Sequence, residues 1–326
     1  METKKRYNDY SSYLSNIFPQ RIQKISINAG FTCPNRDGKI GFGGCTYCNN
    51  QTFHPDYFML KKQKRFEHSK NPPGEFRGDF VFVFLLSKLN FFRKKYENQR
   101  YLAYFQAYTN TYDKLEILIS KYEEALSHPL VVGIVIGTRP DCIDNLLLDY
   151  LERVSKTKYV MIEFGIESTD DDTLKFINRG HNFATARNAI IATSQRGIAT
   201  GAHLILGLPK ENKDIILKHA QNISELPLTC IKLHQLQLIK GTKMAQQYLK
   251  NPEWFYLYSA DEYIDLAIDF IERIHPDFVV ERFISQSPTE LLLKPSWGLK
   301  NFEFTAKLEK RMRERDSIQG KLHKQI

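Results

Sequence analysis

The sequence predicts an α/β protein built on a mostly parallel β-sheet, and two observations support this fold class. Segments with strand character alternate with helical segments from residue 101 onward, which is the pattern of repeated βαβ units. Each predicted strand is rich in β-branched or aromatic residues and is almost continuously apolar, as expected for a parallel sheet that is buried on both faces. An open sheet and a partial barrel both fit this pattern, and in either one the chemistry belongs at the carboxyl ends of the strands.

The predicted elements follow one another in a regular order. Strands are predicted at residues 25–28, 101–108, 131–137, 159–166, 199–206 and 231–239, with a candidate seventh at 278–283. Helices are predicted at residues 113–127, 143–155, 170–177, 183–196, 212–225, 242–249 and 259–274. Residues 59–95 combine a charge run, a turn signal and the apolar run 80–86, and we assign them no element. We expect residues 1–290 to form the main domain and residues 291–326 a C-terminal extension that is helical or partly disordered.

The composition predicts a globular protein with a large core. Apolar residues make up 42% and aromatic residues 13% of the 326 positions, which argues against a disordered chain. The 46 basic and 37 acidic residues leave a net charge of +9, which permits a nucleic-acid partner without requiring one. The N-terminus does not read as a signal peptide, and no apolar run approaches the ~20 residues of a membrane span. We therefore expect a cytoplasmic protein with no membrane partner, in which cysteines stay reduced.

Three of the five cysteines lie close together after the first predicted strand. Cys33, Cys45 and Cys48 fall within sixteen residues in a glycine-rich segment, and glycine lets the backbone wrap closely around a bulky group. Three interpretations compete: unligated reduced cysteines, a structural zinc site with His54 as the fourth ligand, or an iron–sulfur cluster with one iron left open. Cys142 and Cys230 stand alone, and we expect them to be core or loop residues.

The cysteine segment resembles that of the radical S-adenosylmethionine enzymes. Cys45-Thr-Tyr47-Cys48 matches the family's Cys-x-aromatic-Cys motif, and the eleven residues between Cys33 and Cys45 resemble the branch related to the catalytic subunit of the elongator complex. A bacterial group related to that branch is more similar still, over most of the chain. The segments that carry this resemblance are 103–112, 137–141, 164–168 and 203–209.

The resemblance implies a fold, two cofactors and an electron donor. The fold would be a partial (βα)6 TIM-like barrel over residues 1–290, with an N-terminal loop that holds a [4Fe-4S] cluster through Cys33, Cys45 and Cys48. The cluster would cleave S-adenosylmethionine reductively, and the resulting 5′-deoxyadenosyl radical would abstract a hydrogen atom from the substrate. The electron would come from a protein such as flavodoxin or ferredoxin.

The resemblance also implies which residues contact S-adenosylmethionine, most of them at the ends of predicted strands. They are Tyr47, Thr109, Asn110, Thr111, Arg139, Glu167, Arg179 and His203. Several of these residues have structural alternatives. Glu167 and Arg179 could form an ordinary ion pair, and Arg139 could belong to a helix start that Asp141 caps. His203 could be a histidine of the core.

The sequence leaves the substrate open. The elongator resemblance and the basic runs at residues 61–65, 93–95 and 307–315 make tRNA a candidate, and a small molecule is the other candidate. The contrasting hypothesis is a non-catalytic, zinc-stabilised RNA-binding protein, which metal analysis would distinguish from an iron–sulfur enzyme.

Overall fold

The computed structural model describes residues 5–49 and 98–324. Residues 1–4, 50–97 and 325–326 are not described. The predictions for residues 59–95, the basic runs at 61–65 and 93–95, and the proposed zinc ligand His54 therefore lie outside the described residues.

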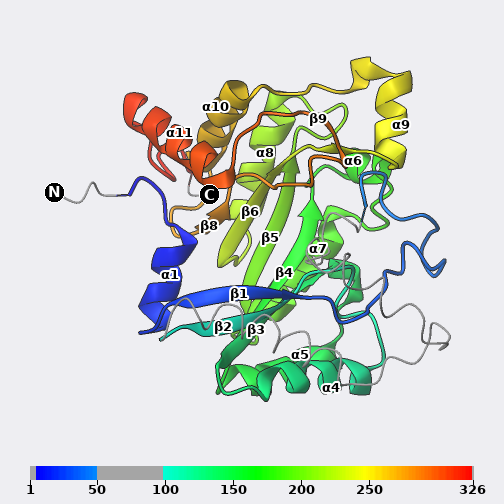
Figure 1. Cartoon of the computed structure of the whole chain (residues 1–326), viewed down its shortest axis with the longest axis vertical. Coiled ribbons are helices and arrows are strands. Elements are labelled where there is room, and N and C mark those ends of the chain that lie inside the picture. Colours follow the sequence, from blue (N-terminus) through cyan, green and yellow to red (C-terminus); the bar gives the residue numbers. More distant parts are fainter. Residues whose placement is uncertain (1–4, 50–97, 325–326) are drawn as a thin grey trace.

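The described residues contain a seven-stranded sheet in which every neighbouring pair of strands is parallel. The strand order is β1-β2-β3-β4-β5-β6-β8, so the strands follow one another almost in chain order and the sheet curls into a half-barrel (Figure 1). Its strands are β1 (Ile22–Ile27), β2 (Arg100–Phe105), β3 (Val131–Thr138), β4 (Tyr159–Glu167), β5 (Ala199–Leu206), β6 (Cys230–Gln235) and β8 (Val279–Arg282). This arrangement confirms the predicted α/β partial barrel, and β8 is the candidate seventh strand predicted at residues 278–283.

Helices cover the outer face of the half-barrel. The helices that follow strands β2 to β6 are α4 (Leu115–Leu126), α5 (Asn145–Ser155), α6 (Asp171–Phe176), α7 (Phe183–Ser194), α8 (Lys213–Ser224), α9 (Lys243–Lys250) and α10 (Ala260–Ile271). All of them except α4 begin at a capping side chain. Asp144, Asn182 and Asn212, for example, each accept a hydrogen bond from a backbone N–H three residues later, at 2.9–3.0 Å. Each such cap stabilises its helix by about 1 kcal/mol. No described helix is both long and apolar enough to span a bilayer.

Alternation along the strands separates two apolar layers. On β2, Tyr101, Ala103 and Phe105 pack into the core beneath the helices. Leu102 and Tyr104 point the other way, into a second cluster that includes Leu14 of α1 (Tyr10–Ile17). Because side chains alternate between the two faces of a strand, α1 covers the inner face near the amino ends of the strands. The polar side chains of the inner face therefore lie at the middle and the carboxyl ends of the strands.

The C-terminal part of the chain packs against the barrel. Helix α11 (Asn301–Glu314) buries Phe304, Leu308 and Met312 in the same core as α10. A short antiparallel pair forms between β7 (Leu238–Ile239) and β9 (Leu292–Lys294). The predicted strand 231–239 therefore divides into β6, which belongs to the barrel, and β7, which does not.

Candidate metal and cofactor site

The three clustered cysteines lie on a tightly turned loop after β1. The backbone N–H of Arg36 donates to Cys33 O at 2.9 Å, and that of Cys48 donates to Cys45 O at 3.0 Å. The Asn178 side chain holds this loop against the α6–α7 connection by donating to Gly44 O at 2.9 Å. As a result, all three cysteines line one cavity at the carboxyl ends of the strands.

Nitrogen donors surround two of the sulfur atoms. Asn35 Nδ2 lies 3.6 Å and Arg179 Nη1 lies 3.5 Å from Cys45 Sγ, while Arg36 Nη1 lies 3.6 Å from Cys48 Sγ. Burial, with a further contribution from the neighbouring Cys45, raises the pKa of the Cys48 thiol to about 12. A bound metal ion reverses this preference, because a coordinating thiol is deprotonated. The donor set therefore fits a metal centre that is held by thiolates and faced by cationic side chains.

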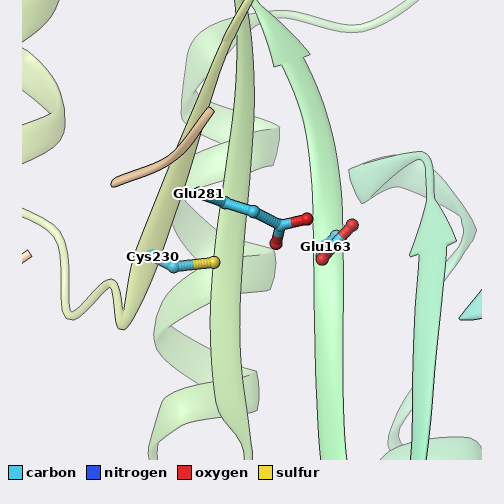
Figure 2. Close-up of side chains that lie close together, drawn as sticks. All are labelled: Glu163, Cys230 and Glu281. Carbon is cyan, nitrogen blue, oxygen red and sulfur yellow. The ribbon is translucent and has the colours of Figure 1, made fainter. Parts of the chain in front are cut away.

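Sulfur atoms that bind a single zinc ion lie close to one another. In tetrahedral zinc sites the Zn–S distance is about 2.3 Å, which places sulfur ligands about 3.8 Å apart. Among the described residues, the one trio of metal-ligand side chains whose ligand atoms all lie within 4.8 Å of one another is Glu163, Cys230 and Glu281 (Figure 2). Cys33, Cys45 and Cys48 do not form such a group in the described structure.

Six of the eight side chains predicted to bind S-adenosylmethionine line the same cavity as the cysteines. They are Tyr47, Thr109, Arg139, Glu167, Arg179 and His203. These residues come from the cysteine loop, the ends of β2, β3 and β4, the α6–α7 connection and the middle of β5. The curl of the sheet brings them together, because successive parallel strands present their carboxyl ends at the same mouth of the barrel.

Glu167 and Arg179 form the wall of the cavity next to Cys45. A register shift between β4 and β5 falls at Gly165/Glu167, and Glu167 takes the left-handed φ of +72°. Burial raises the pKa of the Glu167 carboxyl, while Arg179 and a hydrogen bond from Tyr47 oppose that rise. At 3.9 Å the Arg179–Glu167 contact is long for an ion pair, and Arg179 Nε is buried without a hydrogen-bond partner in the described structure.

Arg139 serves the local structure and also faces the cavity. It donates two hydrogen bonds to Asp141, at 2.9 and 2.8 Å, and a third to Arg179 O at 2.7 Å. It also stands at the N-cap of the short helix η3 (Pro140–Cys142). Its Nη1 is buried with no partner among the described residues. The interpretation that Asp141 caps this helix start is wrong, because Asp141 lies inside η3 and binds Arg139 instead. Nη1 of Arg139 remains for a ligand.

Asn110 and Thr111 do not line the cavity. Asn110 Nδ2 donates to Phe105 O at 3.1 Å and to Gly137 O at 2.7 Å. The Thr111 and Thr138 hydroxyls lie 2.6 Å apart. These contacts fasten the end of β2 to the end of β3 and thereby fix the position of Thr109.

Two family profiles match the sequence. The profile of the Radical SAM superfamily matches residues 30–223, and the profile of the Radical_SAM C-terminal domain matches residues 228–314. The chain belongs to the radical SAM superfamily. It is thus an enzyme of the radical SAM class, as the resemblance implied.

Individual relatives confirm the predicted branch. YtqA of Bacillus subtilis (strain 168) is 34% identical over 328 residues, which cover 99% of this chain and 95% of that protein. The tRNA uridine(34) acetyltransferase of Dehalococcoides mccartyi (strain CBDB1) is 27% identical over 118 residues, which cover 35% of this chain and only 25% of that protein. The solved structure of archaeal Methanocaldococcus infernus Elp3 with an N-terminal deletion has a TM-score of 0.61 at 13% identity, covering 92% of this chain and 64% of that chain. That likeness shows a shared fold.

A buried network of charges lies below the cavity of this radical SAM protein. Glu163 on β4 accepts from Lys24 at 2.7 Å and from Lys232 at 2.5 Å, and its second oxygen also lies 3.0 Å from His203 Nε2. Glu281 on β8 contacts the same two lysines at 2.6 and 3.0 Å. Two carboxylates thus face two ammonium groups. Although Glu163, Cys230 and Glu281 are close together (Figure 2), the lysines already neutralise their charge, and the group does not require a metal ion.

Sequence reasoning missed several residues of this site. Arg36, Gln106, Glu163, His234 and Arg282 line the cavity as well. The sequence signal that could have found them was a charged residue or a histidine inside an otherwise apolar strand, as with Glu163 in β4 and Arg282 in β8. Cys142 and Cys230 do not line the cavity, and Cys230 is fully buried.

Proposed function

We propose that Cys33, Cys45 and Cys48 bind three irons of a [4Fe-4S] cluster and that S-adenosylmethionine binds in the cavity beside them. The observation that carries the proposal is the lining of one cavity by all three cysteines together with the polar side chains at the strand ends. Three thiolates leave one iron of such a cluster open. When bound, the reduced cluster supplies the electron that cleaves S-adenosylmethionine, which yields a 5′-deoxyadenosyl radical for hydrogen abstraction from the substrate.

We assign the protein's side chains the following roles. Arg36, Asn35 and Arg179 donate hydrogen bonds to the sulfur ligands, which stabilises thiolates. Glu167 would accept from ribose hydroxyls, and Tyr47 orients it through their hydrogen bond.

The remaining side chains would contact the methionine part or act through a neighbour. The unpartnered nitrogens of Arg179 and Arg139 would bind the carboxylate of S-adenosylmethionine, and the Thr109 hydroxyl would accept from its ammonium group. His203 forms part of the wall on β5. Asn110 and Thr111 would act indirectly by positioning Thr109.

Metal content tests the cluster. Anaerobically reconstituted wild type should contain about four iron atoms per chain and absorb near 400 nm. Cys33→Ala, Cys45→Ala and Cys48→Ala should each lose most of that iron, because each removes one of only three ligands. Cys142→Ala is the matched control, since this half-buried cysteine does not line the cavity. About one zinc per chain in the wild type, or full iron content in Cys45→Ala, would contradict the proposal and favour the zinc-stabilised RNA-binding alternative.

We further propose that the substrate is tRNA and that a flavodoxin or ferredoxin supplies the electron. The support for tRNA is the relationship to a protein named for acting on tRNA uridine(34). The described basic run at residues 307–315 adds little, because Arg311 and Arg315 are paired with Asp265 and Asp269.

Comparison of modified nucleosides tests the tRNA proposal. Digested tRNA from cells with and without the gene should differ in one modified nucleoside, measured by liquid chromatography and mass spectrometry. The wild-type gene should restore the missing nucleoside, and the gene carrying Cys45→Ala should not. Identical nucleosides in both strains, together with a changed small-molecule pool, would show that the substrate is a small molecule.

A further inference from the structure

Arg282 at the carboxyl end of β8 faces the cavity without an acidic partner. No carboxylate oxygen of the described residues lies within 4.0 Å of its nitrogens, whereas Lys24 and Lys232 inside the barrel each contact two glutamates. Its Nε is buried with no hydrogen-bond partner in the described chain. A guanidinium has five N–H donors and is always charged, so this side chain has unused capacity for an anion.

The charges around Arg282 are already balanced without it. Glu163 and Glu281 are matched by Lys24 and Lys232 in the network below. Of the residues that line the cavity, Arg139 is paired with Asp141 at 2.8 Å, and Arg179 faces Glu167. Arg36, the other lining cation without an acidic partner among the described residues, already contacts Cys48 Sγ at 3.6 Å. The charge of Arg282 is therefore available at this end of the barrel, which makes an incoming negative group favourable.

Two histidines beside Arg282 are neutral donors or acceptors. Burial, reinforced by the charge of Lys232, lowers the pKa of His203 to about 4. Burial and the charge of Arg282 hold the pKa of His234 well below its usual value. Arg282 Nη2 lies 3.1 Å from His234 Nε2, so this nitrogen accepts and the proton of the ring resides on Nδ1. His234 thus orients the guanidinium without competing for its charge.

The cavity continues past Arg282 into a second chamber. The two chambers share six residues, Tyr47, Gln106, Glu167, His203, His234 and Arg282. The polar residues that the second chamber adds include Gln235, Gln237, Ser285 and Ser287. Ser285 and Ser287 both donate to Gln237 Oε1, at 3.2 and 2.8 Å, which leaves the amide hydrogens of Gln237 for another acceptor. A ligand in the second chamber would meet one unpaired cation and several neutral polar groups.

We propose that this second chamber holds the substrate and that Arg282 binds an anionic group on it, a carboxylate or a phosphate. The assignment rests on the proposed function, since it places the substrate next to the S-adenosylmethionine cavity. Arg282 would bind the anion in the bidentate manner that guanidinium favours, with the Gln237 amide and the neutral histidines completing the contacts.

Calorimetric titration of the anaerobically reconstituted protein with small anions tests this assignment. Inorganic phosphate and acetate serve as probes at constant ionic strength, with saturating S-adenosylmethionine present so that Arg179 and Arg139 are occupied. Arg282→Gln should weaken binding by roughly tenfold or more, and Arg282→Lys should weaken it less, because lysine keeps the charge but loses the bidentate geometry. Arg187→Gln is the matched control, since Arg187 is exposed on α7, and it should bind as the wild type does.

The two probes distinguish the two sources of the anion. Tighter phosphate binding that depends on Arg282 indicates a phosphate-bearing substrate, and tighter acetate binding indicates a carboxylate. Equal affinity in the wild type and Arg282→Gln overturns the proposal, as does equal weakening by Arg187→Gln. If Arg282→Gln does not fold, the comparison of Arg282→Lys with the wild type decides in the same way. Iron content measured on the same samples distinguishes failure of the proposed function from failure of the Arg282 assignment, because failure of the proposed function would appear as missing iron in the wild type.

Discussion

At the scale of single residues, the cavity wall depends on Gly165 as much as on charged side chains. Glu167 takes a left-handed φ of +72°, which costs a non-glycine residue about 1 kcal/mol or more. The register shift beside it turns its side chain toward Arg179. That arrangement has room only because Gly165 has no Cβ. An added Cβ would lie 2.6 Å from Glu167 Oε1 and 2.8 Å from Arg179 Nη2.

Gly165→Ala should therefore lower the free energy of unfolding by about 1 kcal/mol, the low end of overpacking costs, because the atoms it meets are side-chain ends that can shift toward the cavity. Denaturant unfolding of the metal-free protein measures this change. Because the clash involves the Arg179 side chain, Gly165→Ala should cost clearly less in an Arg179→Ala background. Gly201→Ala is the control, since its Cβ would meet Glu163 and Cys230 instead, at 3.0 and 3.1 Å. An unchanged cost of Gly165→Ala without Arg179 would contradict this account.

At the scale of elements, sequence predicts best where local signals agree. The predicted strand at 199–206 coincides with β5, and the helix predicted at 212–225 differs from α8 by one residue at each end. For β5 the signal is the largely apolar character of the segment. For α8 it is the polar cap at Asn212, which marks where the helix begins.

The strand predicted at 231–239 was too long because its end depends on distant residues. Gln235 exchanges hydrogen bonds with the backbone of Ser285, at 2.9 and 2.8 Å. Beyond this point the chain leaves the barrel, and β7 pairs with β9 about 50 residues later. A partner so far along the chain leaves no local signal in an apolar segment.

The residues of the candidate site were likewise predictable only where a local sequence signal marks them. Cys33, Cys45 and Cys48 fall within sixteen residues of sequence, and Arg139 and Glu167 fall at strand ends, so motif and position point to them. Arg282 and the network of Lys24, Glu163, Lys232 and Glu281 are assembled from β1, β4, β6 and β8. Only the curl of the sheet brings these side chains together, and it is not visible in any one strand.

At the scale of the whole molecule, β1 and β8 are the two outermost strands of the half-barrel in the part of the chain that the structure describes. A backbone contact ties β8 to the segment before α1, and an ion pair joins β1 and β8 directly. Val280 N donates to Asn8 O at 2.8 Å, just before α1 begins. Lys24 of β1 contacts Glu281 of β8 at 2.6 Å. The charge network therefore sits where the curvature of the sheet is fixed, below the cavity that needs that curvature.

Removing one charge from the network should destabilise the fold strongly. Lys24→Met leaves two buried carboxylates facing only Lys232, and breaking a buried ion pair by removing one partner typically costs about 3–5 kcal/mol. Adding Glu281→Gln restores neutrality, so the double variant should recover much of the lost free energy of unfolding in denaturant titrations. Lys5→Met is the control, because the Lys5 side chain is 56% exposed in its ion pair with Asp9 and such pairs contribute about 1 kcal/mol or less. If Lys24→Met is as mild as Lys5→Met, the network does not fix the edges of the half-barrel.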